Sequence, residues 1–125
     1  MRQYNSEEEP PAPIVEAEVF HPRLQMSLKG KAKLDTGAGL SVIPEEWIGE
    51  LRLLPCGEKD VSGYDGRIEK RRTYFVHISF NGNRFEWVEV IASRRENVLI
   101  GRDVLNRLKI VLDGKNLVFE IYDPL

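Results

Sequence analysis

The 125-residue sequence predicts an all-β domain, a barrel or sandwich of short strands with one short helix near the C-terminus. Three observations lead to this fold class. Apolar residues recur at every second position in several runs, which is the period of a strand with one buried face. Asn81-Gly82, a dipeptide typical of tight hairpins, separates two such runs. A helical stripe is found only late in the chain, over Val104, Leu105 and Leu108.

Residues 1–13 precede the predicted domain, which spans residues 14–125. They contain the acidic run Glu7-Glu8-Glu9, followed by Pro10-Pro11-Ala12-Pro13. Charge and proline disfavour a packed core, so a disordered or polyproline-like tail is predicted. The alternative is a propeptide-like segment that is removed on activation, although no cleavage site marks it.

The domain begins with strands. Residues 14–20 are rich in β-branched and aromatic side chains and are predicted as the first strand. From 24 to 34, apolar or small residues alternate with polar ones, several of which are lysines. This alternation predicts half-buried strands with a turn near Lys29-Gly30, and it places the lysines in water. A basic substrate-binding stripe is the alternative reading of those lysines.

The next segment contains a short strand and a helical turn. Val42-Ile43 is the strand, and Pro44 ends it. Residues 45–48 suit a helical turn, because proline is favoured at the first position of a helix. Trp47 is expected to belong to the core or to cover it. Residues 51–54 are predicted as a further strand.

A glycine-rich stretch in the middle of the chain has the composition of a mobile hairpin tip, with strand-like runs on both sides. It comprises Ser62, Gly63, Tyr64, Asp65 and Gly66. One interpretation is an ordinary surface hairpin. The other is a flap that covers a site.

The second half of the domain is predicted as two hairpins with a short strand and helix between them. Residues 73–80 alternate cleanly, and residues 84–91 return as a second strand, so the two form the first hairpin around the Asn-Gly turn. His77 within it is expected to be structural or exposed rather than catalytic. Asp103 can cap the helix. The last hairpin joins residues 110–112 and 117–121 through Asp113-Gly114.

Asp35 is the residue expected to carry chemistry. An aliphatic approach ends in this lone carboxylate, and Thr36 and Gly37 follow at once. That order suits a strand that delivers an acid to a tight loop leading into another strand. A single Asp-Thr-Gly triplet is a weak motif, so its context decides. The context is Val98-Leu99-Ile100-Gly101 well downstream, with the glycine-rich hairpin between the two segments.

On these motifs the chain resembles the retropepsin-like aspartic proteases, the retroviral-protease type, over residues 14–121. The resemblance implies a closed β-barrel that acts as a homodimer, with the glycine-rich hairpin as its flap. It implies that Asp35 is the catalytic acid and that Thr36 locks two active-site loops together across the dimer. The other supports of the active-site loop are Gly37, Ala38, Leu99, Ile100 and Gly101. The terminal strands, near Ile14 and Phe119, pair between subunits in that family.

The chemistry of this class needs two carboxylates that share one proton, because two like charges about 3 Å apart cannot both ionise readily. The chain has one Asp-Thr-Gly and is too short for two lobes. An enzyme of this type must therefore be a symmetric dimer that contributes Asp35 from each subunit. An extended, mostly apolar peptide or protein is the expected substrate.

Two positions depart from or qualify the retroviral pattern. Retroviral enzymes carry an aspartate directly after Asp-Thr-Gly-Ala, and it pairs with the arginine after the later glycine. Here Gly39 occupies that place, while Arg102 is present. Arg102 is therefore a candidate for a structural ion pair with Asp103 or with a carboxylate of a partner chain. Ala38 offers Asp35 no hydroxyl donor, which favours a less acidic dyad and weakly acidic activity.

Composition narrows the remaining possibilities. The net charge of −2 gives no field that would recruit nucleic acid or an acidic membrane. Cys56 is the single cysteine, and His21 and His77 stand in no metal-ligand spacing, so no metal or cofactor is expected. The N-terminal stretch lacks an apolar run, which predicts a cytoplasmic protein with no membrane segment.

Two other functions remain as alternatives, and a third is disfavoured. The first is a catalytically idle, protease-like module for dimerisation or peptide binding, although such a module has no need of Asp-Thr-Gly. The second is an unrelated β-barrel in which Asp35 only caps a turn. A glycosidase with paired carboxylates is disfavoured, because no second acid has a recognisable site context.

Overall fold

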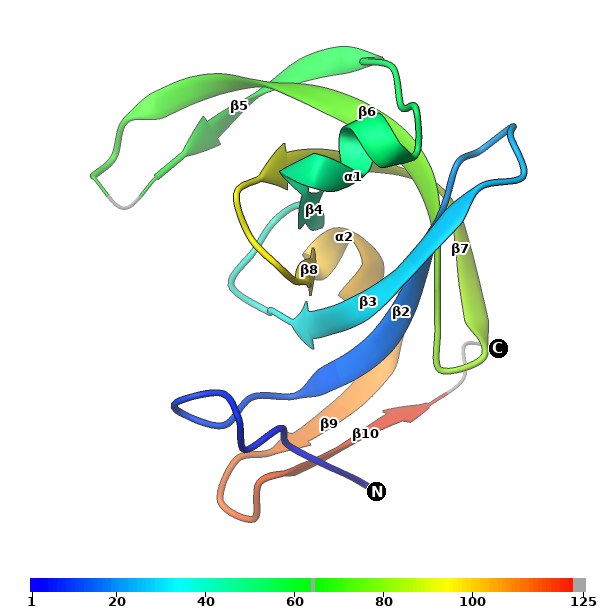
Figure 1. The fold of residues 1–125 in the computed structure, drawn as a ribbon. Helices are drawn as coiled ribbons and strands as arrows, with labels where there is room; N and C mark the ends of the chain where they lie inside the picture. Colours follow the sequence, from blue (N-terminus) through cyan, green and yellow to red (C-terminus); the bar gives the residue numbers. More distant parts are fainter. Residues whose placement is uncertain (64, 123–125) are drawn as a thin grey trace.

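The computed structural model describes residues 1–63 and 65–122. It confirms the all-β prediction (Figure 1). Neither helix in this described part is long and apolar enough to cross a membrane. The elements in chain order are β1 (Arg2–Gln3), β2 (Ile14–Phe20), β3 (Ser27–Leu34), β4 (Val42–Pro44), α1 (Glu45–Glu50), β5 (Gly57–Ser62), β6 (Ile68–Phe80), β7 (Asn83–Ser93), β8 (Val98–Ile100), α2 (Arg102–Leu105), β9 (Lys109–Asp113) and β10 (Val118–Tyr122).

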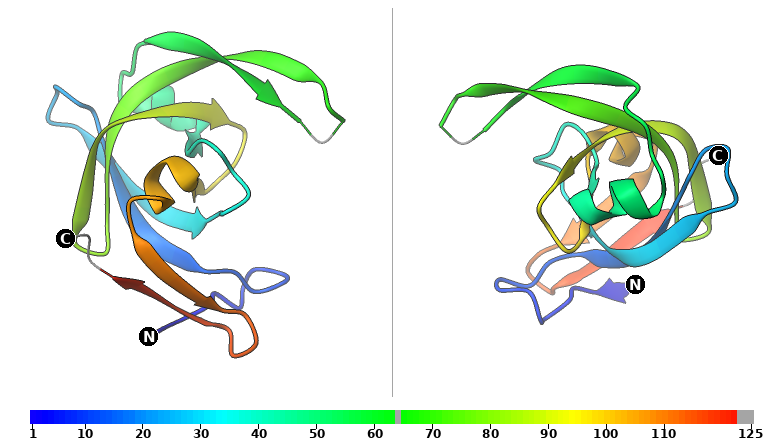
Figure 2. Two further views of the ribbon diagram at one scale, coloured as in Figure 1. Left: turned by 180° about the vertical axis from the view of Figure 1, so that it is seen from behind. Right: turned by 45° about the horizontal axis from the view of Figure 1, so that its top comes forward.

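Six strands close into a barrel. They follow the order β2-β3-β8-β4-β7-β6, and β6 returns to pair with β2. In this closing pair Ala17 lies opposite Phe80 and Phe20 lies opposite His77. β5 continues the sheet beyond the barrel by pairing with the first part of β6. The two strands form a long arm that leaves the barrel in every view (Figures 1 and 2).

The core fills the barrel because side chains alternate between its inside and outside. In β2, Val15, Ala17 and Val19 are almost completely buried, and Glu16 between them is exposed. β3 contributes Ala32 in the same way. The largest fully buried side chains of the barrel strands are Val19, Ile43, Val76, Ile78, Val90, Val98 and Ile100. Alternation read from the sequence therefore identifies most of the core correctly.

The turn predicted near Lys29-Gly30 is absent, since β3 runs unbroken through these residues. The chain reverses earlier, where the backbone N–H of His21 donates to the carbonyl of Met26 at 2.9 Å. Gly30 instead makes room for Trp47, because a Cβ at this position would lie 3.0 Å from two atoms of the indole ring. The glycine marks close packing rather than a turn.

The helical turn predicted over residues 45–48 is confirmed as part of α1. The strand predicted over residues 51–54 is wrong. Leu51 and Leu53 are both buried, but the chain turns between them at Arg52, where φ is 55°. The backbone N–H of Leu53 donates to the carbonyl of Ile48 at 2.9 Å. A turn can therefore bury two leucines at strand-like spacing.

The Asn-Gly hairpin between β6 and β7 is confirmed. Asn81 and Gly82 have φ of 52° and 76°, as a tight hairpin turn requires. The structural reading of His77 also holds, since its side chain is only 6% exposed. Its Nδ1 accepts the backbone N–H of Trp87 at 3.0 Å, where the register of the two strands shifts. This bond satisfies a backbone group that the bulge would otherwise leave unpaired.

The structure differs from the disordered or polyproline-like tail that was predicted for residues 1–13. β1 pairs with β10, and Tyr4 packs edge-on against the buried Phe119. Asn5 and Ala12 exchange two backbone hydrogen bonds, which close the segment between them into a loop. The acidic, proline-containing composition of residues 1–13 gave no indication that one aromatic residue, Tyr4, would pack against the buried Phe119. The strand order of the second sheet is therefore β1-β10-β9.

Candidate active site

Asp35 stands at the point where β3 leaves the barrel. β3 pairs in parallel with β8, and Leu34 lies opposite Ile100. The backbone N–H of Asp35 donates to the carbonyl of Ile100 at 2.9 Å, which continues that ladder by one residue. Leu34 is buried while Asp35 is half-buried, so the carboxylate is held at the rim of the core.

The loop that follows Asp35 turns tightly around its carboxylate. Oδ1 of Asp35 accepts the backbone N–H of Gly37 at 2.9 Å. The carbonyl of Asp35 accepts the backbone N–H of Ala38 at 3.2 Å. A Cβ on Gly37 would lie 3.2 Å from the same Oδ1, so glycine leaves the carboxylate unobstructed. The loop thus fixes the direction of the acid through its own backbone.

Gly101 supports this loop from behind. A Cβ at Gly101 would come within 2.8 Å of the backbone of Leu40 and 2.9 Å of the carbonyl oxygen of Ala38. The next residue, Arg102, donates its backbone N–H to that carbonyl at 2.8 Å. The structure therefore brings the Asp-Thr-Gly loop and the Leu99-Ile100-Gly101 segment into direct backbone contact. Only a residue without a side chain permits this approach.

Ser41 and Asp103 form a lock that sequence reasoning missed. The Ser41 hydroxyl donates to Oδ1 of Asp103 at 2.8 Å and accepts the backbone N–H of Gly101 at 3.0 Å. The backbone N–H of Ser41 donates to Oδ2 of Asp103 at 3.1 Å. Asp103 was predicted to cap the helix, but the cap position belongs to Gly101. The signal available in the sequence was a serine directly before the apolar pair Val42-Ile43, and the structure shows this serine to be fully buried.

Arg102 does not pair with Asp103, whose carboxylate instead accepts the hydroxyl and the backbone N–H of Ser41. Nη1 of Arg102 donates to the carbonyl of Thr36 at 2.8 Å. Across the residues that the structure describes, Arg102 forms no salt bridge. A Cβ at Gly39 would lie 3.6 Å from Nη2 of Arg102, so Gly39 does face the guanidinium but offers it no charge. Arg102 therefore ties down the Asp-Thr-Gly loop through a backbone carbonyl.

The predicted flap is a real hairpin, built from β5 and β6. Its loop is closed by a hydrogen bond of 3.1 Å from the backbone N–H of Gly63 to the carbonyl of Arg67. Gly66 adopts a φ of 75°, which glycine tolerates without strain. Tyr64 lies outside the described residues. The tip extends on the same side of the barrel as the loops after β3 and after β7, which Figure 2 shows in both views.

Charged side chains lie close to the Asp-Thr-Gly loop. Nζ of Lys33, two residues before Asp35, is 3.7 Å from Oε1 of Glu8 in the N-terminal loop. Burial lowers the pKa of Arg95, while the carboxylates of Asp35 and Glu8 raise it. Arg95 therefore stands within electrostatic range of both acids. No cluster of three or more metal-binding side chains is present in the described part of the chain.

A closed six-strand barrel with an Asp-Thr-Gly loop, braced from behind by a glycine of the later strand, defines the retropepsin-like class of aspartic proteases. Residues 26–104 match the family model described as aspartyl protease, and the chain belongs to this family. No curated protein matches the sequence.

Solved structures resemble the chain in fold. The solution structure of the simian foamy virus (mac) protease has a TM-score of 0.55 at 22% identity, covering 74% of this chain and 91% of that protein. EIAV protease with a bound inhibitor has a TM-score of 0.57 at 21% identity, covering 82% and 90%. A retropepsin-like aspartic protease from Rickettsia conorii has a TM-score of 0.50 at 19% identity, covering 89% and 94%.

Proposed function

We propose that the chain is an aspartic endopeptidase whose catalytic dyad consists of Asp35 from each of two identical subunits. The observation that carries the proposal is the held carboxylate of Asp35. Its Oδ1 is fixed by the N–H of Gly37, and its backbone is fixed by β8. A turn cap would need the first of these bonds but not the bracing by Gly101 and the lock formed by Ser41.

In the proposed reaction two Asp35 carboxyl groups share one proton. The ionised carboxylate removes a proton from water, and the water oxygen attacks the carbonyl carbon of the peptide bond. The protonated carboxyl group donates its proton to the carbonyl oxygen. The carboxyl group that took its proton from water then passes that proton to the amide nitrogen, while the other carboxylate takes a proton from a hydroxyl group of the tetrahedral intermediate. The C–N bond breaks, the amine leaves, and the dyad again holds one shared proton. The dyad titrates as a unit with two apparent pKa values.

The proposed dimer contact is a groove beside the catalytic loop. The groove has a volume of about 220 Å³, and Thr36 and Arg102 from the catalytic side line it together with Leu105, Leu108, Ile110 and Leu112. Leu112 is 41% exposed, so an apolar surface meets solvent here in the single chain. A second copy that covers the groove would bring a second Thr36, and with it a second Asp35, to the first.

The edge of β9 supports the same contact. In the family, the regions corresponding to Ile14 and Phe119 pair between subunits. Here Ile14 is already paired with Lys33 inside the barrel, and Phe119 is fully buried. β9 is the terminal strand of its sheet, with β10 on one side and no neighbour on the other within the described chain. An unpaired edge of this kind accepts a strand from a second copy.

The first test is cleavage of an unfolded polypeptide between about pH 4 and pH 7, with and without a pepstatin-type inhibitor. Wild-type protein should cleave, and the inhibitor and Asp35→Asn should each abolish cleavage. Cleavage that survives Asp35→Asn would assign the activity to another site or to a contaminant. No cleavage at any pH by a proven dimer would favour the idle, protease-like module.

The second test concerns the subunit count. Mass in solution, measured over a range of concentrations, should shift from monomer to dimer, and specific activity should rise with the dimer fraction. Activity from a species that is monomeric at every concentration would contradict a shared dyad.

A further inference from the structure

The guanidinium of Arg102 carries a charge that no acid of the described chain neutralises. An arginine side chain stays ionised in proteins. Nη1 of Arg102 donates to the backbone carbonyl of Thr36 at 2.8 Å, and a carbonyl is a neutral acceptor. Within residues 1–63 and 65–122, Arg102 forms no salt bridge with a carboxylate. A full positive charge therefore lies beside the Asp-Thr-Gly loop.

The other end of the guanidinium faces Gly39. A Cβ built on Gly39 would lie 3.6 Å from Nη2 of Arg102, which is an ordinary van der Waals contact. Because Gly39 has no side chain, Nη2 is open on this side, and both residues are exposed. Thr36 lines the groove of the proposed dimer contact, whereas Gly39 does not. The two ends of the guanidinium thus serve different surfaces, Nη1 the groove and Nη2 the loop.

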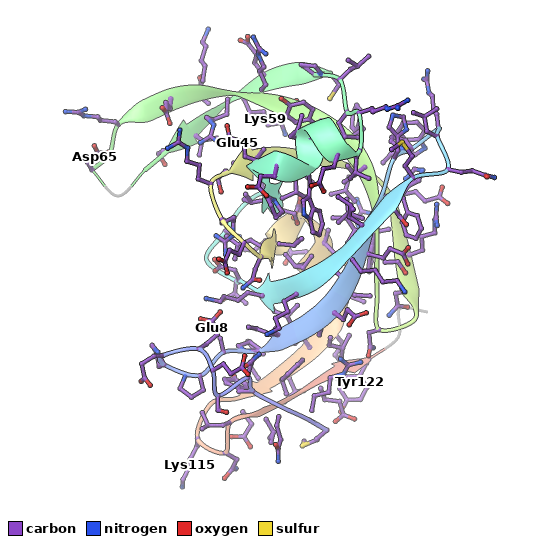
Figure 3. The ribbon with its side chains drawn as sticks, in the orientation of Figure 1. Glu8, Glu45, Lys59, Asp65, Lys115 and Tyr122 are labelled. Atoms are coloured by element: carbon purple, nitrogen blue, oxygen red, sulfur yellow. The ribbon has the colours of Figure 1, made fainter. Side chains whose placement is uncertain are left out.

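The acids elsewhere on the molecule have cations of their own. Figure 3 shows Glu8 in the N-terminal loop, Glu45 on α1 and Asp65 at the tip of the β5–β6 hairpin. These three acids pair at 3.3 to 3.7 Å with Lys33, Arg94 and Arg67, respectively. Asp103, the direct neighbour of Arg102, is held by Ser41.

Gly39 lies within reach of a peptide bound at Asp35. The carbonyl of Asp35 accepts the backbone N–H of Ala38 at 3.2 Å, and such a turn brings its first and last Cα atoms within about 7 Å. Gly39 is one residue further, about 3.8 Å. An extended peptide advances about 3.3 Å per residue, so a side chain within about three residues of the cleaved bond can reach Gly39. The tip of the β5–β6 hairpin extends on the side of this loop (Figure 2).

We propose that Arg102, left open by Gly39, selects substrates that carry glutamate or aspartate within about three residues of the cleaved bond. The inference rests on the proposed protease function. The substrate carboxylate accepts a hydrogen bond from Nη2 at the place where Gly39 has no side chain. A bound peptide displaces water from the guanidinium. An acidic residue replaces that water with a charged acceptor, whereas a neutral residue leaves the donor poorly satisfied, which weakens binding.

The test measures peptide binding by the full-length Asp35→Asn protein, at a concentration where ultracentrifugation shows only dimer. Two fluorescent peptides are identical except for one residue, Glu or Gln, which is moved through three positions on each side of a central apolar pair. At one position the Glu peptide should bind about twofold to fivefold more tightly than its Gln twin at low salt. The ratio should fall in high salt.

Matched variants of the loop and of the arginine identify the cause. Gly39→Asp places a carboxylate beside Nη2 and should bring the ratio to one or below. Gly39→Asn has the same shape without the charge and should keep a ratio above one. Arg102→Gln should abolish the ratio, and Arg107→Gln should preserve it, since Arg107 is an exposed arginine of the same region. If Arg102→Gln does not fold, the two Gly39 variants decide, because a Cβ fits at this position.

Equal binding of the twins at every position, no binding of either, or loss of the ratio in both Gly39 variants alike would overturn the proposal. Equal binding together with a changed dimer dissociation constant in Gly39→Asp would also overturn it, and would assign Nη2 to a carboxylate of the second copy. Cleavage by wild-type protein tests the proposed function separately. If both twins are cleaved with the same kcat/KM, the protease stands and the preference fails. If the Glu twin binds more tightly but neither twin is cleaved, the preference stands and the protease fails.

Discussion

The hydroxyl of Ser41 donates to Oδ1 of Asp103 at 2.8 Å, across 62 positions of sequence. The hydroxyl oxygen of Ser41 also accepts the backbone N–H of Gly101, so one buried hydroxyl joins the loop after Asp35 to the strand end and the helix that brace it. Ser41 is fully buried and Asp103 half-buried, and no water is needed to satisfy either side chain. The geometry around Asp35 depends on this pair although neither residue touches the carboxylate.

Ser41→Ala should therefore destabilise the protein. The change leaves the N–H of Gly101 and one oxygen of Asp103 without their partner, and an unsatisfied buried group costs about 1–3 kcal/mol. Chemical denaturation measures the loss. Ser41→Cys, which restores a weak donor of similar size, should recover part of it. Wild-type stability in Ser41→Ala would show that the lock contributes nothing to the fold.

Gly101→Ala should be more damaging than a glycine replacement elsewhere. The new methyl group meets backbone atoms of Leu40 at 2.8 Å, and backbone cannot move aside as a flexible side chain can. We expect the free energy of unfolding to fall by about 1–3 kcal/mol. Cleavage should also weaken, since the loop around Asp35 must shift. Thermal melting and activity are the measurements.

Gly49→Ala is the matched control for that substitution. Gly49 lies in α1 with open space around its Cβ position. Alanine there should stabilise the protein by about 0.5–1 kcal/mol, because it restricts the unfolded chain and suits a helix. Equal effects of the two substitutions would contradict the proposed close approach at Gly101.

Leu112→Lys should separate the subunits of the proposed dimer. Leu112 lines the groove beside Thr36, and a charge there would be buried on association. We expect the dimer dissociation constant to rise at least about tenfold, with a parallel loss of cleavage at low protein concentration. Analytical ultracentrifugation provides the constant.

Val111→Lys controls for the added charge. Val111 is next to Leu112 in β9 and similarly exposed, at 38% against 41%, but adjacent strand residues point to opposite faces. Val111→Lys should leave both the dimer dissociation constant and the cleavage activity close to wild type. Dissociation by both variants alike would mean that the groove is not the contact surface.

Asn116→Ala should raise the pKa of Asp113. The side chain and the backbone N–H of Asn116 donate to Asp113 at 2.8 Å and 3.1 Å, and these bonds hold the pKa of its carboxyl below its usual value. The substitution removes the side-chain donor, so NMR titration should show Asp113 moving toward its ordinary pKa. Lys115→Ala, in the same hairpin, should leave the titration unchanged.

The sign of the stability effect follows from the direction of this shift. Because the pKa of Asp113 is lower in the folded chain than in the unfolded chain, the ionised form favours folding. Its contribution is present above the unfolded pKa and is lost as pH falls through the folded pKa. The stability difference between wild type and Asn116→Ala should therefore shrink in acid; a difference that grows there would contradict the hydrogen-bond explanation.

Local signals predicted the fold well. The strand over residues 14–20 and the turn at Asn81-Gly82 are each determined by residues that are neighbours in sequence. Asp35 was identified as the candidate acid because a strand, a tight loop and glycine follow one another directly in the sequence. Such features are encoded in a short window, where side-chain period and turn chemistry agree.

Tertiary contacts explain what the sequence did not reveal. Gly30 was read as a turn because its partner Trp47 is distant in sequence. Leu53 was read as a strand residue because two leucines at strand-like spacing, Leu51 and Leu53, do not reveal the turn at Arg52 between them. The lock between Ser41 and Asp103 was missed for the same reason, since each residue has a plausible local role by itself.

Closure of the barrel has a consequence for the timing of folding. β2 pairs with β6, and the backbone N–H of Asp35 donates to the carbonyl of Ile100, so both the barrel and the Asp-Thr-Gly loop need contacts between segments far apart in the chain. Contacts of this kind form slowly, because a long loop must be closed before any of them is gained. A chain that is still emerging from the ribosome carries Asp35 without Gly101 and Asp103 behind it. The fold thereby delays assembly of the loop geometry until nearly the whole domain has been synthesised.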